Sequence, residues 1–278
     1  MQNNRHLIFS SFILKIIAMI AVLSDHVAYA FLSSSSPLYF GMRIFGRLAF
    51  ILFAFFLSEG IIYSRNKDSY LLRLLILYVV MQVLIVAVNL YDSSFEFSNV
   101  FFTLFAVGSF LVYFEKKKWS HVHYLVPLLT LLVINYLNVY QNFSTLYIYT
   151  GDYHFYGIAV IIGFYLARKF ASYLLNRYPL VSDLEDGDIE EDIRRKKQVI
   201  MNASSSVSLL LITFIWYILS VFNMSDIAMN MQSYAIITIP LLILYNGRLG
   251  HNGKTFRIVY YGFFPVHLIL LALISLLI

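Results

Sequence analysis

The chain has 278 residues, of which 60% are hydrophobic and 13% are charged, and its mean hydropathy is +0.75. Because a soluble domain must cover itself with polar groups, this composition excludes an ordinary soluble globular protein. Cysteine is absent, which excludes disulfides, thiolate metal ligands and a cysteine nucleophile in this chain. The net charge of +5 is spread over separate short basic segments rather than one aromatic-interleaved patch, so we expect no nucleic-acid partner.

Recurrent apolar runs of about 20 residues predict an all-α, polytopic helical integral membrane bundle that sits in a lipid bilayer. We expect about nine transmembrane helices, within a range of eight to ten, in a single transmembrane domain over residues 1–278. The fourth and eighth runs are short, which is consistent with tilted, partly buried or discontinuous helices. The nine apolar segments are residues 9–32, 38–63, 70–90, 99–114, 123–140, 155–174, 204–222, 233–245 and 258–278.

Links that contain Lys or Arg alternate along the chain with links that contain neither. Under the positive-inside rule, this alternation places the N-terminus in the cytoplasm and the C-terminus outside. The largest polar segment, residues 175–202, holds an acidic run over residues 183–192 and then a basic run over residues 194–197. We interpret it as a charged, solvated cytoplasmic loop with a short charged helix. The basic links contain Arg5, Arg65 and Lys67, residues 116–118, residues 168–197, and Arg248, Lys254 and Arg257.

The first apolar segment carries three ionisable residues, Lys15, Asp25 and His26. Such groups are costly inside a membrane and are kept mainly where they line a polar cavity and serve a function. Lys15 and His26 are eleven residues apart, so a helix places them on one face, about 16 Å apart along its axis, with Lys15 toward the cytoplasm. The alternative is that Lys15 extends to the membrane interface and His26 packs against a neighbouring helix.

Two arginines, Arg43 and Arg47, stand one helical turn apart near the outer end of the second segment. Like charges at this spacing repel, and the positive-inside rule disfavours cations on this side, so the pair needs an anion. Asp25 is the nearest acidic residue in the sequence. We predict an ion pair between Asp25 and an arginine that positions His26 or binds substrate.

Two further groups of ionisable residues favour structural roles. Glu59, near the inner end of the second segment, is expected to form an ion pair with Lys15 or Arg73. His121 and His123 flank a basic loop without supporting carboxylates, so we expect solvated side chains and no metal site.

Polar residues also mark the later segments. Asn99 opens the fourth segment, Asp152 and Tyr153 lie at the outer mouth of the sixth, and His267 lies inside the last. We expect these four residues to contact substrate. For His267 the alternative is a helix-packing residue whose hydrogen bonds are satisfied within the bundle.

Seven motifs carry a resemblance to a known family. Their order and spacing are similar to those of the TraX family, membrane acetyltransferases named for the enzyme that acetylates the N-terminus of conjugative pilin. The resemblance covers nearly the whole chain outside residues 175–202. The motifs are LKIIAMIAVLSDH, GRLAFILFAFFLSEG, YLLRLLI, NVFFTLF, GDYHFYG, PLLILYNGRLG and YYGFFPVHLILL.

The chain also resembles the broader membrane acyltransferases that O-acetylate surface glycans. Their first span holds a basic residue, ten intervening residues and a histidine, which Lys15 and His26 match. Those proteins often have two arginines at the start of the third span, whereas this chain has Arg73 alone at that place.

The resemblance implies a single acyltransferase domain that uses acetyl-CoA from the cytoplasm and no metal. His26 would act as general base on an amine or hydroxyl that arrives from the outer side. Arg47 or Arg43 would stabilise the oxyanion or orient Asp25. The residues expected to bind the phosphates of acetyl-CoA are Lys15, Arg73, Arg248 and Lys254.

The implied acceptor is an exported pilin-like N-terminus, a small peptide or a surface glycan, and the implied location is the plasma or inner membrane of a bacterium. Without a cysteine, direct transfer is simpler than a thioester on the protein, and transient acetylation of His26 is an alternative. Two other function classes fit the same intramembrane charges. One is a transporter or flippase, against which the lack of an internal repeat weighs. The other is a non-catalytic membrane partner with this fold.

Overall fold

The computed structural model describes residues 7–91, 99–116, 119–141, 153–182, 188–223, 231–275 and 277. Within these ranges the chain forms helices joined by turns, and the one β-type contact is an isolated bridge between Phe9 and Tyr245. The prediction of an all-α bundle is therefore confirmed.

Six helices among the described residues are long and apolar enough to cross a membrane. They are α1 (Ser11–Phe31), α2 (Pro37–Tyr63), α3 (Lys67–Tyr91), α6 (His154–Arg177), α7 (Ile189–Asn223) and α10 (Lys254–Ser275). The shorter elements are α4 (Val100–Lys116), η1 (Trp119–Leu125), α5 (Val126–Gln141), η2 (Gln232–Thr238) and α9 (Ile239–Ile243). Length and hydropathy thus support six of the nine expected spans. α4, with 17 residues, is about 26 Å long, and most of its side chains are buried within the bundle.

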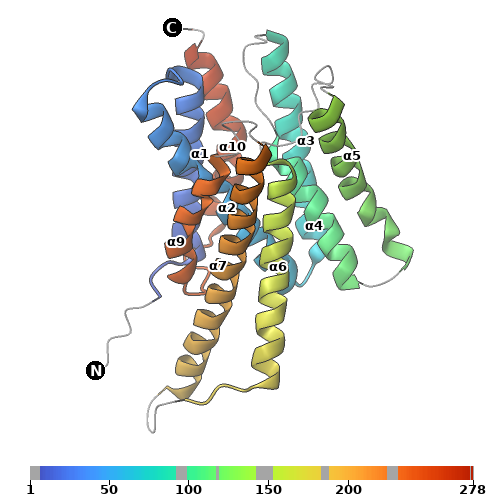
Figure 1. Ribbon diagram of the computed structural model, residues 1–278, viewed down its shortest axis with the longest axis vertical. Helices are drawn as coiled ribbons and strands as arrows, with labels where there is room; N and C mark the ends of the chain where they lie inside the picture. The colour runs from blue at the N-terminus through green and yellow to red at the C-terminus, as the bar shows by residue number, and fades with distance from the viewer. Residues whose placement is uncertain are drawn as a thin grey trace.

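Successive segments run alternately up and down the bundle (Figure 1). α1 begins at the end that also holds the connection between α6 and α7, and α10 ends at the opposite end. We call the end at which α1 begins the inner end, and the end at which α10 finishes the outer end. These names agree with the cytoplasmic N-terminus that the loop charges predict. Six crossings alone would leave the start of α1 and the end of α10 at one end of the bundle, so shorter segments must also contribute a crossing.

α2 lies at the centre of the bundle, in contact with α1, α3, α4, α6 and η2. Its sequence is apolar around the whole helix from Leu48 to Leu57, which is typical of a helix buried on all sides. α1 packs along α2 through small side chains, Ala18, Ala21 and Ala28, all of which are fully buried. This close packing brings the polar residues of α1 and α2 together.

α6 and α7 run side by side and extend beyond the other helices at the inner end (Figure 1). α7 has 35 residues and is therefore about 52 Å long, which exceeds the thickness of a bilayer core. The segment over residues 175–202, expected as a charged loop with a short helix, is helical from Ile189 onward, because α7 begins there. Ion pairs one turn apart support this charged extension, from Glu191 to Arg194 and from Asp192 to Lys196.

The link between α9 and α10 clamps the start of α1. The amides of Ile8, Ser11 and Phe12 donate to the carbonyls of Leu244, Arg248 and Leu249, at 2.9–3.1 Å. Gly250 has a φ of +67°, and a Cβ there would lie 2.5 Å from Ser10 Oγ, so this turn requires glycine. The clamp places Tyr245 beside Ser11 at the inner end.

Candidate active site

Two histidines meet in the outer half of the bundle. His26, half-buried on α1, lies with its Nδ1 2.8 Å from Nε2 of His267 on α10. The two rings are stacked, with centroids 5.0 Å apart and planes 16° apart. Nδ1 of His267 lies 2.8 Å from the carbonyl oxygen of Phe263, one turn earlier on α10.

This arrangement fixes the tautomers of both rings when they are neutral. A carbonyl oxygen only accepts, so Nδ1 of His267 carries the proton that is donated to Phe263. Nε2 of His267 then accepts the hydrogen bond from Nδ1–H of His26. The remaining nitrogen of His26, Nε2, therefore carries a lone pair and no proton, which is the form that a general base requires.

The expected ion pair of Asp25 is present and involves both arginines. Arg43 donates to Oδ2 at 2.7 Å, and Arg47 donates to Oδ1 at 2.9 Å. Asp25 and Arg47 are 6% and 2% exposed, so this contact is shielded from bulk water. Within the described part of the chain, two guanidinium groups thus share one carboxylate.

Two glycines make room for the cluster. A Cβ at Gly46 would lie 2.3 Å from Oδ1 of Asp25, so only glycine at this position lets α1 and α2 approach here. A Cβ at Gly157 would lie 2.8 Å from Cβ of Tyr153. The Tyr153 ring stacks on Phe50, with centroids 3.8 Å apart, and lies 5.3 Å from the Arg47 guanidinium.

A small outer cavity of about 60 Å³ brings together five of the eight residues that were predicted to act in catalysis or to contact substrate. Asn99 lines it from the start of α4, where its side-chain amide donates to the carbonyl of Tyr78 at 3.1 Å and its Oδ1 accepts from the amide of Phe101. Asp152 lies outside the described residues. Arg43 and Arg47 stand behind Asp25 rather than in the cavity wall. The predicted residues that line the outer cavity are Asp25, His26, Asn99, Tyr153 and His267.

A larger inner cavity of about 310 Å³ opens around Lys15. The Lys15 ammonium lies 5.6 Å from the Phe56 ring and 5.4 Å from the Tyr260 ring. Among the residues that the structure describes, no carboxylate lies within ion-pair distance of this ammonium. The polar part of the wall also contains Ser11, Glu59, Tyr63, Tyr70, Tyr245 and Tyr261.

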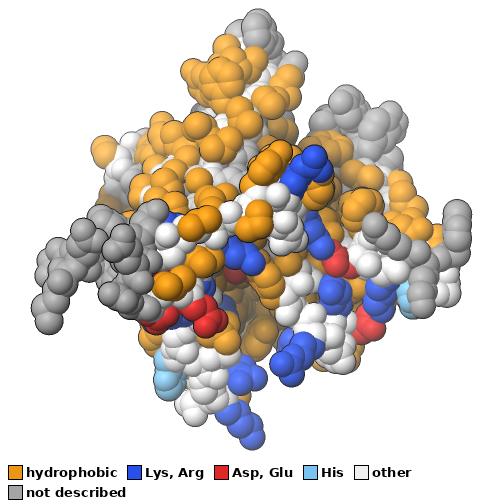
Figure 2. All heavy atoms as spheres, turned by 90° about the horizontal axis from the view of Figure 1, so that it is seen from below, with side chains coloured by type: hydrophobic (Ala, Val, Ile, Leu, Met, Phe, Trp, Pro, Cys, Tyr) orange, Lys and Arg blue, Asp and Glu red, His pale blue; other side chains and the backbone are white. Residues whose placement is uncertain are grey.

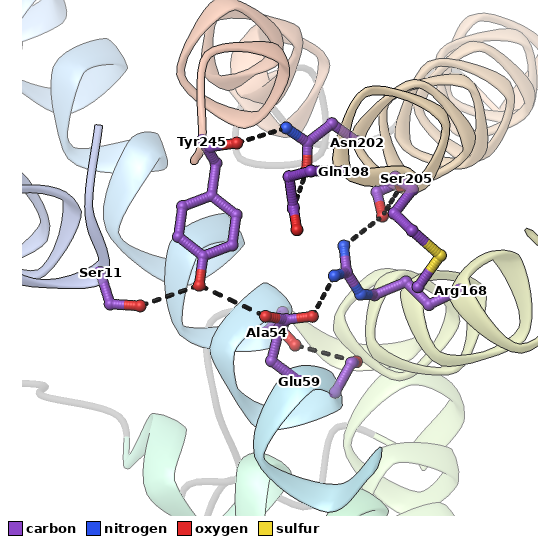
Figure 3. A network of polar contacts seen from close by, with 10 residues as sticks. Ser11, Ala54, Glu59, Arg168, Gln198, Asn202, Ser205 and Tyr245 are labelled. Atoms are coloured by element: carbon purple, nitrogen blue, oxygen red, sulfur yellow. Dashed lines mark hydrogen bonds and ion pairs between the residues drawn. The ribbon is translucent and has the colours of Figure 1, made fainter. Parts of the chain in front are cut away.

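Glu59 pairs with Arg168 of α6, so the expected pairing with Lys15 or Arg73 is wrong (Figure 3). Arg168 is 1% exposed, and its guanidinium also reaches Oγ of Ser205 on α7, at 3.5 Å. Arg168 follows an unbroken apolar run and precedes Lys169, so the sequence favoured a role in topology alone. The structure turns it inward against α2.

The same network continues to the start of α1. The hydroxyl of Tyr245 donates to Oε2 of Glu59 at 3.4 Å and lies 2.9 Å from Oγ of Ser11 (Figure 3). Asn202 of α7 holds the Tyr245 backbone by donating to its carbonyl at 2.6 Å. The network therefore fixes a carboxylate and two hydroxyls in the wall of the inner cavity.

Three of the four expected donor-binding cations lie outside both cavities. Arg73 is exposed beside the Tyr70 ring, Lys254 is exposed at the start of α10, and Arg248 pairs with Glu191 at 2.8 Å. Seen from the inner end, Lys and Arg side chains gather around a hollow in this face (Figure 2). Gly247 and Leu249, on either side of Arg248, do line the inner cavity. Arg248 therefore lies next to the wall of the inner cavity, and Lys15 alone among the four lies inside it.

His121 and His123 lie beside Tyr124 in η1, at the inner end of α4. Within the part of the chain that the structure describes, no group of three or more possible ligands could hold a metal ion.

The fold and the site together define a multi-pass helical membrane protein with a polar site inside the bundle. The sequence pattern of the TraX protein family matches residues 10–182. A probable fimbrial assembly protein from Dichelobacter nodosus, FimC of serogroup H1, is 31% identical over 277 residues, which cover 96% of each chain. No solved structure matches. The chain belongs to the TraX family.

Proposed function

We propose that this protein is an integral membrane acetyltransferase. It moves an acetyl group from cytoplasmic acetyl-CoA to an amine or hydroxyl of an exported or cell-surface acceptor. The observation that carries the proposal is the stacking of two cavities within one bundle. The inner cavity holds Lys15 and opens among cations, the outer cavity holds the His26–His267 pair, and the two share part of their walls.

The inner cavity suits the donor. Acetyl-CoA is a polyanion with a long, thin arm that carries amides and ends in the thioester. Exposed Arg73, Arg248 and Lys254 attract its phosphates at the entrance. Inside, the Lys15 ammonium supplies a further cation, and the network around Glu59 supplies acceptors and donors for the amides of the arm.

His26 activates the acceptor in the outer cavity. Its Nε2 takes a proton from the acceptor N–H or O–H as the acceptor nitrogen or oxygen attacks the thioester carbonyl carbon. The carbon–sulfur bond then breaks, and the CoA sulfur leaves with the electron pair and takes up a proton. His267 touches no reacting atom in this scheme. It accepts from Nδ1–H of His26 and so keeps the base in the required tautomer.

The arginine cluster stabilises the negative charge that develops on the carbonyl oxygen. Both oxygens of Asp25 are turned toward Arg43 and Arg47, so Asp25 holds the guanidinium groups in place and is not a dyad partner of the adjacent His26. Asn99 also lines the outer cavity, and its side-chain nitrogen already donates to the Tyr78 carbonyl and to Oε1 of Gln82, each at 3.1 Å, so it shapes the wall rather than binding the oxyanion. Because neither arginine lines the outer cavity, the cluster acts on the developing charge through its electrostatic field rather than through a direct hydrogen bond.

The comparisons support the choice of acceptor and location. A relative named as a fimbrial assembly protein favours a pilin-like exported subunit over a surface glycan. The bacterial source of that relative, together with six apolar helices long enough to span a membrane, favours the inner membrane of a bacterium.

The test is acetyl-CoA consumption by the purified protein in lipid vesicles, with an envelope extract as the source of acceptor. His26→Ala should abolish acetyl transfer. His123→Ala, which removes an exposed histidine of η1, is the matched control and should retain it. Full transfer by His26→Ala would overturn the assignment of the base. Movement of a solute across the vesicle membrane without acetyl-CoA consumption would favour a transporter instead.

A further inference from the structure

The two cavities meet at three phenylalanine rings. Phe53 of α2, Phe101 of α4 and Phe264 of α10 each line both the inner and the outer cavity. The Phe264 ring packs edge to face against Phe53, with centroids 5.5 Å apart, and against Phe101, with centroids 4.9 Å apart. All three side chains are less than 10% exposed. We call this cluster the aromatic constriction.

The helix that carries Phe264 is weakened at this place. Pro265 lies inside α10 and has no N–H, so the carbonyl of Tyr261 cannot receive the usual helical hydrogen bond. Gly262 lies three residues before Pro265, and a Cβ built on it would have no atom within 4 Å, so this face of the helix is loosely packed. A small bend at this point would move Phe264 while its neighbours on α2 and α4 stay in place.

Water in the outer cavity would compete with the acceptor. Its oxygen, activated by His26, would attack the thioester carbonyl, and the carbon–sulfur bond would break to give acetate and CoA thiol. Phenyl rings offer no hydrogen-bond partners, so water that passes between them loses its hydrogen bonds. A close-packed set of rings between the polar inner cavity and the base therefore favours transfer over hydrolysis.

We propose that the aromatic constriction is a water-excluding gate, and that Phe53, Phe101 and Phe264 are specificity-determining residues that admit the thin thioester arm and exclude bulk water. The assignment of the arm rests on the proposed acetyltransferase function. The existence of a barrier between the two cavities does not depend on that function, because the packing of the three rings alone defines the barrier.

The absence of cysteine allows a direct test of the barrier. Leu74→Cys places a thiol in the inner cavity, and Ala49→Cys places one in the outer cavity. Each is exposed to a small charged thiosulfonate reagent on the inner face of vesicles. Leu74→Cys should react, and Ala49→Cys should be protected until Phe101→Ala is added. Phe114→Ala, an exposed phenylalanine of the same helix, is the matched control and should leave Ala49→Cys protected.

Phe101→Leu keeps the core filled and guards against a folding defect in Phe101→Ala. With Phe101→Leu, the labelling rate of Ala49→Cys should lie between the rates measured with Phe101 intact and with Phe101→Ala. The unfolding temperature of Phe101→Leu should be unchanged. Rapid labelling of Ala49→Cys with all three rings intact would overturn the gate. So would continued protection in a folded Phe101→Ala protein.

Acetyl-CoA turnover measured with and without acceptor separates the gate from the proposed function. In Phe101→Ala the ratio of hydrolysis to transfer should rise at least ~10-fold, whereas Phe114→Ala should leave it unchanged. If the intact protein neither transfers nor hydrolyses acetyl groups, the acetyltransferase proposal fails, and the labelling result still decides the barrier. If transfer is normal and the ratio stays constant in Phe101→Ala, the gate fails alone.

Discussion

Replacing His267 tests whether it positions the base. In His267→Leu the volume is nearly kept, but Nδ1–H of His26 loses the acceptor that lies 2.8 Å away. A buried hydrogen-bonding group left without its partner costs about 1–3 kcal/mol, and here the cost falls on the orientation and tautomer of the base. Since 1.36 kcal/mol corresponds to a tenfold change in rate, kcat should fall roughly 5- to 150-fold.

The KM for acetyl-CoA should change little in His267→Leu, because His267 lines the outer cavity and not the inner one. His267→Gln, whose side-chain oxygen can accept from His26, should recover part of the lost rate. Initial rates across acetyl-CoA concentrations measure kcat and KM for both variants. A wild-type kcat in His267→Leu would refute this role.

Three other predictions concern the outer half. Asp25→Asn removes the carboxylate that pairs with the buried Arg47 and the half-buried Arg43. It should lower the free energy of unfolding by about 3–5 kcal/mol in denaturant titrations, whereas Asp68→Asn, at the surface, should cost under ~1 kcal/mol. Gly46→Ala should lower the free energy of unfolding by about 1–3 kcal/mol, because its Cβ would overlap Asp25. Gly41→Ala, with open space around it, is the control and should leave the stability unchanged. Equal unfolding temperatures for the two variants would contradict the packing at Gly46. The outer cavity of about 60 Å³ has room for about five water-sized positions, which suits an acetyl group and not an eight-carbon chain. The protein should therefore transfer acetyl groups from acetyl-CoA and should not use octanoyl-CoA. Equal rates for the two donors would show that the acyl group lies elsewhere.

The Asp25 cluster could be predicted because its cause is local. Two cations one turn apart in an apolar segment need an anion, and Asp25 was the nearest one. The site residues also follow from a simple rule, since polar residues inside spans tend to face the interior. Asn99, Tyr153 and His267 were singled out for that reason, and the structure places all three in the wall of one cavity.

The pairings between distant helices could not be predicted in the same way. His26 and His267 are 241 residues apart, and their contact depends on the register of α10 against α1. No spacing rule within one helix gives that register. The pairing of Arg168 with Glu59 was missed for a related reason, because a basic residue at the end of a span has the same sequence pattern whether it faces the cytoplasm or a buried carboxylate.

The number of membrane spans could not be fixed from the sequence, because some apolar segments are close to the minimum length of a span. α4 is apolar and buried like a span but has 17 residues, and the segment over residues 233–245 divides into η2 and α9. Apolar runs of this size predict a helix in the bundle without fixing whether it crosses the bilayer. The charged helix at the start of α7 was expected, but its ion pairs make it continuous with the following apolar segment, which the sequence had separated from it.

The most direct test of the central claim uses vesicles of one orientation. Acetyl-CoA labelled in the acetyl group is supplied on the inner face alone, and a pilin-like acceptor peptide is supplied on the outer face alone. The label should appear on the outer peptide with the intact protein and with His123→Ala, and should be absent with His26→Ala. Label on the peptide at equal rates with His26→Ala, or no label on any outer amine or hydroxyl acceptor with the intact protein, would contradict an acetyl path through this bundle to His26.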